Sequence, residues 1–453
     1  MLPVRTAPQC ESVHDMEGRM TTEVRGRDEA VRSERRVVAN VIRGSIGNLI
    51  EWYDWYTYTA FSVYFAAAFF PKGDLTAQLL NTAGVFAIGF LMRPLGGWML
   101  GRYADRFGRR AALTLSVTLM ACGSLVIALA PGYHTIGLAA PVLLVLARLV
   151  QGVSVGGEYS TSATYLSEVA TAGRRGFYSS FQYVTLVAGQ LTALGVQIVL
   201  LQVLSNDEME QWGWRIPFVI GAIGALVVMW LRRGMDETES YRRASAGTEQ
   251  RGTVRALLQH PKECLLVVGL TLGGTVAFYT YTTYLQKFMV NTSGIDKSTV
   301  AWINFLALLV FLCLQPLAGA LSDRIGRRWL LLGFGVCGTV LTVPLMTVLG
   351  GTQNPVLAFA LMLAGLTIVS GYTSINAIVK AELFPTNIRA LGVGLPYALT
   401  VAIFGGTSEY VALWLKQAGL ENAYFWYVSG CVLISLLVYL RMRETSKDSR
   451  IEG

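Results

Sequence analysis

Two acidic residues stand in an aromatic and apolar stretch near the start of the chain. The stretch reads GNLIEWYDWYTY over residues 47–58 and contains Glu51 and Asp54. An ionised side chain at the centre of a bilayer costs roughly 2.5 to 3.5 kcal/mol even on lenient insertion scales. Burial raises the pKa of a carboxyl group and a nearby cation lowers it. Because an acid that alternates between such surroundings can carry a proton, both residues are candidate proton carriers, with a structural ion pair as the alternative.

Glu158, in the stretch VGGEY, is a third candidate proton carrier because it lies inside another apolar run. The histidines offer no competing carrier. His14, His134 and His260 all fall outside the apolar runs. Proton carriage is therefore assigned to carboxylates.

Two arginines also lie deep inside apolar runs. Arg93 occurs in LMRPLGGW and Arg148 in ARLVQG. A guanidinium group stays charged and binds a carboxylate through two parallel hydrogen bonds. Two such groups facing one polar passage would suit a compact dicarboxylate. For Arg148, a structural pair with Glu158 or Asp54 remains an open alternative.

Neutral polar residues are weaker candidates for substrate binding. Tyr58 falls on the same helical stripe as Glu51 and Asp54, since successive side chains turn by about 100°. Gln182 and Tyr281 lie in later apolar runs. Helix packing is the alternative role for each of them. The second half of the chain offers hydroxyls and amides at comparable depth, so we expect the charges and protons to be handled by the first half.

The elements that must position these residues are membrane-spanning helices. The chain has 453 residues, of which 53% are hydrophobic and 15% charged, against roughly 25% charged in soluble domains. Apolar runs of about twenty residues, the length that crosses a hydrocarbon core of about 30 Å, recur throughout. The predicted fold class is all-α, with twelve spans at residues 41–70, 77–101, 111–130, 137–165, 177–203, 213–233, 264–289, 298–321, 329–350, 355–379, 391–414 and 421–441.

The basic residues predict the orientation of the chain. Cytoplasmic segments carry an excess of Lys and Arg, and the loops on the other side hold only Lys72, Lys287, Lys297 and Lys416. Both termini are therefore predicted to be cytoplasmic. The expected domains are a disordered tail at 1–39, a six-helix bundle at 40–233, a linker at 234–262, a second six-helix bundle at 263–442 and a tail at 443–453.

A repeated motif links the two halves. GRYADRFGRR after the second span recurs as GALSDRIGRR after the eighth, with Gly, Asp, Gly, Arg and Arg at the same spacing. We predict that these clusters hold the halves together in one conformation, and topological anchoring by the basic residues is the alternative. Arg215, near the outer end of the sixth span, is predicted to act in a gate or an external salt bridge. The motif residues concerned are Gly101, Asp105, Gly108, Arg109, Gly319, Asp323, Gly326 and Arg327.

These motifs resemble those of the major facilitator superfamily. The repeated loop is similar to its loop signature, and ARLVQGVSVGGEY is similar to its fourth-helix signature. GNLIEWYDWYTY resembles the metabolite:proton symporter family, and LMRPLGGW and KAELFPTNIRALGVGLPYA resemble the α-ketoglutarate permeases within it. The resemblance implies two six-helix bundles, alternating access, and uptake of α-ketoglutarate or a related dicarboxylate with protons across a bacterial inner membrane. It also favours Arg93 for substrate binding and links Arg148 to proton coupling.

Other functions are less consistent with the sequence. No HExxH or phosphate-binding loop is present, so an enzyme is not expected. The cysteines show no metal-ligand spacing, and no cofactor or metal is expected. Basic and aromatic residues do not interleave as they do in nucleic-acid surfaces. The expected partners are a small organic acid, protons and the lipid bilayer, with a monomer by fold analogy. Carriers of citrate, shikimate or zwitterionic osmolytes remain alternatives within the same family.

Overall fold

The acidic stretch belongs to one long helix at residues 48–69. Every side chain from Glu51 to Ala66 on this helix is buried. A helix on the lipid-facing surface would expose one side. The helix therefore lies in the interior of the protein, and its acids do not face the acyl chains.

The computed structural model describes residues 48–71, 74–107, 109–169, 173–233, 257–385, 388–447 and 449. These residues belong to one compact unit that begins at Ile46. The predicted tail at 1–39 and positions 234–256 of the predicted linker lie outside the described residues.

Helices account for all regular secondary structure in the described residues. After helix 48–69, the first half contains α2 (Leu75–Leu91), α3 (Arg93–Phe107), α4 (Arg109–Leu129), α5 (Tyr133–Ile136), α6 (Ala139–Val169), α7 (Arg175–Val203), α8 (Asn206–Gln211), η1 (Gly213–Arg215) and α9 (Ile216–Arg233). The second half contains α12 (Pro261–Tyr279), η2 (Thr280–Tyr284), α13 (Leu285–Asn291), α14 (Lys297–Ile325), α15 (Arg327–Gly350), α16 (Pro355–Thr373), α17 (Asn376–Leu383), α18 (Arg389–Thr400), η3 (Val401–Gly405), α19 (Gly406–Gln417) and α20 (Glu421–Arg441).

These helices follow the predicted spans. Ten described helical segments are long and apolar enough to cross a membrane, and Thr114–Leu129 is a shorter apolar helix at the position of the third span. Helix 48–69 corresponds to the first span. Each predicted span therefore contains a helix.

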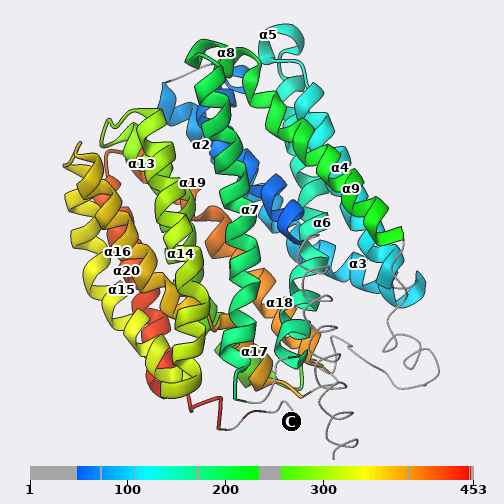
Figure 1. Cartoon of the computed structure of the whole chain (residues 1–453), viewed down its shortest axis with the longest axis vertical. Coiled ribbons are helices and arrows are strands. Elements are labelled where there is room, and N and C mark those ends of the chain that lie inside the picture. The colour runs from blue at the N-terminus through cyan, green and yellow to red at the C-terminus, as the bar shows by residue number, and fades with distance from the viewer. Residues whose placement is uncertain are drawn as a thin grey trace, which may run out of the picture. The chain divides into compact units, whose positions relative to one another are not determined.

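The helices pack as two groups that contact each other along defined pairs. Within the first half, α6 packs against α3 and α4, and α4 packs against α9. Within the second half, α20 packs against α12 and α15. Between the halves, α7 lies beside α14 (Figure 1), α2 packs against α19, and α6 packs against α17 and α18.

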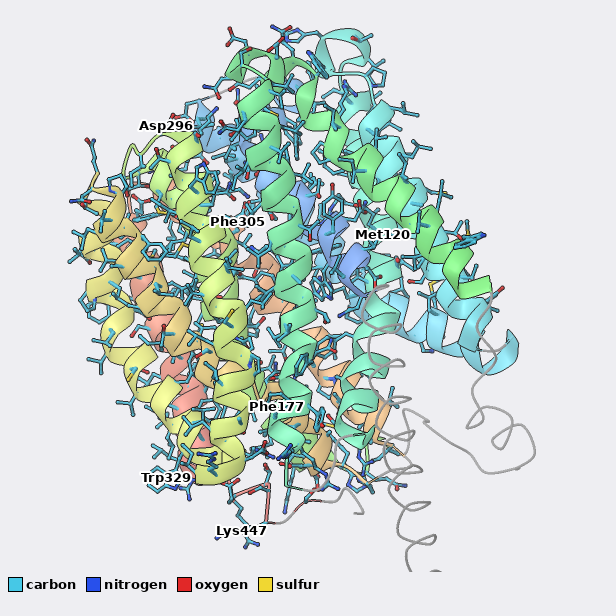
Figure 2. The ribbon with its side chains drawn as sticks, viewed as in Figure 1. Met120, Phe177, Asp296, Phe305, Trp329 and Lys447 are labelled. Atoms are coloured by element: carbon cyan, nitrogen blue, oxygen red, sulfur yellow. The ribbon has the colours of Figure 1, made fainter. Side chains whose placement is uncertain are left out.

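Helix α9 ends at Arg233 and α12 begins at Pro261, so the linker joins both halves at one end, which we call the linker end. Phe177, Trp329 and Lys447 lie toward the linker end, and Asp296 lies at the opposite, far end (Figure 2).

Two π-helical turns interrupt the helices of the second half. η2 joins α12 to α13, and η3 joins α18 to α19. Nε2 of Gln190 in the first half donates a hydrogen bond to the carbonyl oxygen of Thr282 in η2 at 2.6 Å, and η3 packs against α2. Because π-turns are frequent at functional sites, their position at the contact between the halves places the candidate site there.

Candidate functional site

Trp55 lies against two buried guanidinium groups. Cζ of Arg148 is 3.9 Å from the centroid of the Trp55 ring, and Cζ of Arg93 is 4.6 Å from it. Arg148 is 0% exposed and Arg93 is 5% exposed. An aromatic face attracts a cation, more strongly when both are desolvated. Helix 48–69, α3 and α6 therefore bring the two predicted substrate-binding arginines to one aromatic wall.

Both arginines keep donors that no described residue uses. Nε and Nη2 of Arg93 and the same atoms of Arg148 are buried without a hydrogen-bond partner. A buried donor left unpaired costs roughly 1 to 3 kcal/mol, and more when it is charged. Because a guanidinium group matches a carboxylate through two parallel hydrogen bonds, the pair can bind an anion.

Asp54 is joined to Arg148 through a neutral side chain. Nε2 of Gln151 donates to Oδ2 of Asp54 at 2.9 Å, and Oε1 of Gln151 accepts from Nη1 of Arg148 at 2.8 Å. The hydroxyl of Ser124 also donates to Oδ2 of Asp54. Oδ1 of Asp54 is buried, has no partner among the described residues and lies beside Gly221 of α9. The acid and the arginine therefore form an indirect link, not a direct ion pair.

Glu51 faces the same helices as Asp54. It is 5% exposed, and Oε1 accepts a hydrogen bond from the hydroxyl of Ser154 at 3.2 Å. Ser154 also contacts Ser116 of α4. Both acids of the opening stretch therefore lie between helix 48–69, α4 and α6, whereas the side chain of Glu158 is outside what the structure describes.

Buried tyrosines from both halves extend the site toward the second half. The hydroxyl of Tyr56 lies near that of Tyr279 but has no hydrogen-bond partner among the described residues, and Tyr397 interacts with Tyr159 and Tyr183. The rings of Tyr159 and Tyr397 stack with centroids 4.0 Å apart. Tyr279 and Tyr397 also interact electrostatically with Arg93. Phenolic hydroxyls can donate to and accept from a bound oxo-acid.

The other predicted substrate-binding residues take different positions. The Tyr58 ring lies 4.5 Å from Cζ of Arg148, and its hydroxyl donates to the carbonyl oxygen of Thr82. Gln182 is buried in α7. The hydroxyl of Tyr281 contacts that of Thr342 in α15 at 3.3 Å, within the second half. The structure thus brings Tyr58 to the arginines, and Tyr281 packs elsewhere.

The expectation that deep charges belong to the first half is wrong. Lys287 lies inside α13 and not in a loop, and it forms an ion pair with Glu409 of α19. Lys287 is 1% exposed and Glu409 is 2% exposed. Lys380 of α17 is 0% exposed. A hydropathy count registers only the charge of each lysine and therefore places it at the end of a span. It does not register the buried polar partner or aromatic surface that accommodates each charge.

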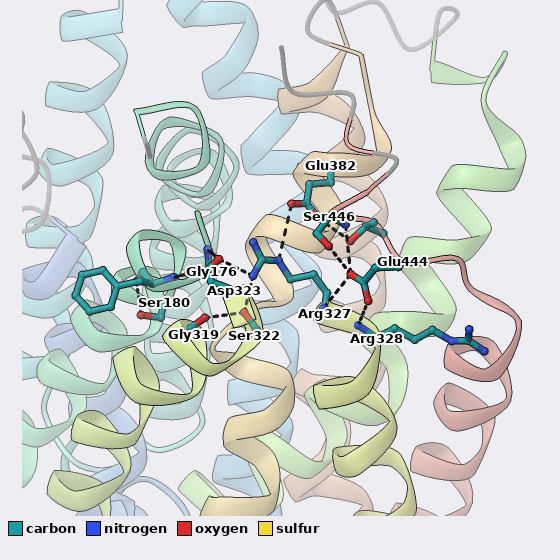
Figure 3. A network of polar contacts seen from close by, with 12 residues as sticks. Gly176, Ser180, Gly319, Ser322, Asp323, Arg327, Arg328, Glu382, Glu444 and Ser446 are labelled. Atoms are coloured by element: carbon teal, nitrogen blue, oxygen red, sulfur yellow. Dashed lines mark hydrogen bonds and ion pairs between the residues drawn. The ribbon is translucent and has the colours of Figure 1, made fainter. Parts of the chain in front are cut away.

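The repeated motif of the second half contacts the first half at the linker end. The carboxylate of Asp323 accepts hydrogen bonds from the backbone N–H groups of Gly176 and Phe177 at 2.8 and 2.9 Å, at the start of α7 (Figure 3). Nη1 of Arg327 donates to Asp323 at 2.7 Å and to Ser322 at 2.6 Å. An acid at a helix N-terminus is favourable for the free N–H groups and the dipole. Asp323 therefore bridges the two halves.

Two glycines allow close approaches at the linker end. A Cβ atom on Gly319 would lie 2.5 Å from the carbonyl oxygen of Gly176, so α14 and α7 can meet here only without one. Gly326 ends α14 and has a φ of 97°, a backbone angle that residues other than glycine rarely adopt. A Cβ atom there would lie 2.6 Å from Oε2 of Glu444.

Glu444, in the segment after α20, completes the cluster. Its carboxylate accepts from the backbone N–H groups of Arg327 at 2.9 Å and Arg328 at 3.0 Å, at the start of α15. Partial burial raises the pKa of Glu444, but these hydrogen bonds outweigh it and the pKa lies below its ordinary value. Glu444 could not be predicted from the sequence, since nothing in its spacing relates it to the motif.

The remaining predicted gating residues are less informative. The side chains of Asp105 and Arg109 and the surroundings of Gly101 are outside the described part of α3 and α4, and Gly108 is outside the described residues altogether. Nη1 of Arg215 donates to the carbonyl oxygens of residues 128 and 130 at 2.8 and 2.6 Å, at the end of α4. Arg215 therefore contacts backbone oxygens of its own half, and its role in a gate stays a prediction.

The halves also meet at the far end. Nζ of Lys297 in the second half lies 2.8 Å from Oε1 of Glu210 in the first half. Nδ2 of Asn291 donates to the hydroxyl of Thr76 at 3.2 Å. The buried arginines and tyrosines thus lie between contacts at both ends.

Comparisons with known proteins identify the family. Residues 41–256 match the sugar (and other) transporter family, and residues 266–453 match the Major Facilitator Superfamily. The α-ketoglutarate permease of Escherichia coli (strain K12) is 52% identical over 417 residues, covering 92% of this chain and 96% of that protein. The chain belongs to the major facilitator superfamily. A citrate-proton symporter of Salmonella typhi is 34% identical to this facilitator over 401 residues, covering 87% of this chain and 92% of that protein.

Solved structures agree on the fold. The xylose transporter XylE from E. coli, in a partially occluded inward open conformation, matches this facilitator with a TM-score of 0.66 at 18% identity, covering 89% of this chain and 96% of that one. The predicted fold class of two six-helix bundles is therefore confirmed. This facilitator is a multi-pass membrane transporter and not an enzyme.

Several residues of the facilitator site were missed by sequence reasoning. Gln151 follows Arg148 by three positions, a spacing that places both on one helix face, so it could have been found. Trp55 directly follows Asp54 in the sequence, but aromatic residues fill the whole stretch and single none out. The pairing of Lys287 with Glu409 spans 122 positions and leaves no local signal.

Proposed function

We propose that this facilitator is a proton symporter that takes up α-ketoglutarate or a closely related dicarboxylate. The observation that carries the proposal is the pair of buried guanidinium groups at Trp55, whose donors are unused by the described residues. The 52% identity to a protein named α-ketoglutarate permease supports the choice of substrate.

Arg93 and Arg148 bind the substrate in this proposal. One carboxylate occupies the unused donors of the two groups, and the buried tyrosine hydroxyls at Tyr56 and Tyr279 bind the remaining oxygens. Desolvation strengthens such charge-assisted bonds because the local dielectric is low. Tyr58 orients Arg148 through its ring, and Gln182 shapes the pocket.

Asp54 carries the proton, and Gln151 couples it to the substrate. Ionised Asp54 accepts from the Gln151 amide, which in turn holds Nη1 of Arg148. Protonation of Asp54 weakens its hold on Gln151 and frees Arg148 to bind a carboxylate. The proton and the substrate then raise each other's affinity, as thermodynamic linkage requires of coupled binding. Glu51 and Glu158 are the alternative carriers.

Alternating access follows from contacts at the two ends. Asp323 and Arg327 close the linker end against α7, and Lys297 with Glu210 closes the far end. Breaking one set while keeping the other opens the central site to one side of the membrane. We place the linker end and both termini in the cytoplasm, on the excess of basic residues there, and the protein in a bacterial inner membrane as a monomer.

Uptake into proteoliposomes tests the proposal. Labelled α-ketoglutarate should accumulate when an inward proton gradient is imposed and should only equilibrate without it. Unlabelled succinate, citrate, shikimate and betaine are then added as competitors. Stronger competition by citrate would favour the activity named for the citrate-proton symporters, and stronger competition by betaine would favour an osmolyte carrier. The absence of uptake for all of them would refute the transport assignment.

A further inference from the structure

Lys380 in α17 carries a buried positive charge that the proposed function leaves unused. Its side chain is 0% exposed. Nζ lies 3.6 Å from the centroid of the Tyr397 ring and 5.4 Å from that of Tyr159, and it donates a hydrogen bond to the Tyr159 hydroxyl at 3.3 Å. Among the described residues, no carboxylate pairs with it.

The other buried lysine of the second half has a carboxylate partner. Lys287 is neutralised by Glu409. Glu382, on the same helix as Lys380, has other partners. Its carboxylate accepts a hydrogen bond from the hydroxyl of Thr445 at 2.6 Å and lies 3.8 Å from Nε of Arg327. Buried charges are normally paired, and an unpaired one inside a membrane protein marks a functional position. Lys380 is therefore available to pair with an anion that is not part of the described chain.

The position of Lys380 is suited to the substrate. Helices α17 and α18 of the second half pack against α6 of the first. Tyr159 of α6 stacks on Tyr397 of α18 with an angle of 13° between the rings, and Tyr397 interacts with Arg93 as well as with Lys380. One buried aromatic pair thus contacts Lys380 of the second half and interacts electrostatically with Arg93 of the first.

We infer that Lys380 binds the second carboxylate of the substrate and selects dicarboxylates over monocarboxylates. This inference rests on the proposed function. One carboxylate binds Arg93 and Arg148 in the first half, and the other displaces the Lys380 ammonium from the tyrosines and pairs with it in the second half. A dicarboxylate then bridges the halves, whereas a monocarboxylate leaves Lys380 unpaired.

Lys380→Gln tests the inference against a ligand pair of equal chain length. Uptake of α-ketoglutarate is measured in competition with 2-oxopentanoate, which lacks the second carboxylate. A hydrogen bond to a charged group contributes about 1.5 to 3 kcal/mol. The half-saturating concentration of α-ketoglutarate should therefore rise about ten- to a hundredfold, and that of 2-oxopentanoate should change less than about twofold. Lys262→Gln, at an exposed lysine at the start of α12, is the matched control and should behave as wild type.

Several outcomes would overturn the inference. A folded Lys380→Gln protein that keeps the wild-type preference for α-ketoglutarate, or that loses both ligands equally, would do so while leaving the proposed function intact. A wild-type protein that takes up no dicarboxylate would overturn both. If Lys380→Gln does not fold, Lys380→Arg replaces it: its longer charged side chain should shift the preference toward succinate over glutarate at least about threefold, and an unchanged ratio contradicts the inference.

Discussion

Arg93 and Arg148 place their guanidinium groups against the same indole ring, that of Trp55, at 4.6 and 3.9 Å. Two like charges so close repel each other unless something offsets the repulsion. The ring faces supply part of the compensation, because an aromatic quadrupole attracts cations. An incoming carboxylate would supply the rest, which makes this pair the centre of the predicted substrate site.

Replacement of Arg93 by lysine is expected to weaken substrate binding although the charge is kept. An ammonium group is a point charge and cannot form the two parallel bonds of a guanidinium group. The half-saturating concentration for α-ketoglutarate uptake should rise about tenfold or more, given about 1.5 to 3 kcal/mol for one charge-assisted bond. Unchanged kinetics in Arg93→Lys would remove this residue from the site.

Asp54→Asn should separate transport from the proton gradient. The amide can still bind Gln151 and Ser124 but cannot take up a proton, so gradient-driven accumulation should fall at least about tenfold while exchange of internal for external substrate continues. Glu51→Gln serves as the comparison and should keep most of the accumulation. If both variants accumulate substrate as the wild type does, neither acid is the proton carrier.

Gly319→Val should favour the conformation in which the linker end is open. A Cβ atom at Gly319 meets the carbonyl oxygen of Gly176 at 2.5 Å, whereas one at Gly333 meets nothing within 4 Å. Overpacking typically costs about 1 to 3 kcal/mol, so the closed form should lose about fivefold or more in population. Spin labels at the exposed positions Arg174 and Trp329 should report longer distances in Gly319→Val. Gly333→Val is the control, and equal distances in the two variants would contradict the role of Gly319.

Glu444→Gln should destabilise the protein in a pH-dependent manner. The pKa of Glu444 is lowered in the folded state, so its carboxylate stabilises the fold above the ordinary glutamate pKa, and this contribution is lost as the pH falls through the lowered value. Thermal unfolding in detergent should show a lower Tm for Glu444→Gln at pH 7 and a vanishing difference in strong acid. Asp207→Asn, at an exposed acid of α8, should show no such trend. A difference that grows in acid would refute the assigned contacts.

The second half shows where sequence reasoning stopped. The spans that contain α13 and α19 were predicted, yet the ion pair of Lys287 with Glu409 between them was not. A repeated motif pointed to Asp323, but its partners at Gly176 and Phe177 could not be read from the motif.

The amino-acid sequence by itself determined the spanning helices, their division into two related halves and the presence of acids and arginines at depth. These are local properties, since hydrophobic transfer and helical periodicity act within some twenty residues. Only the tertiary structure decided which charges meet: Asp54 with Arg148 through Gln151, Lys287 with Glu409, and Lys380 with two tyrosines. Such pairs form when helices distant in sequence pack, so the free energy of burying a charge depends on neighbours that no local pattern records.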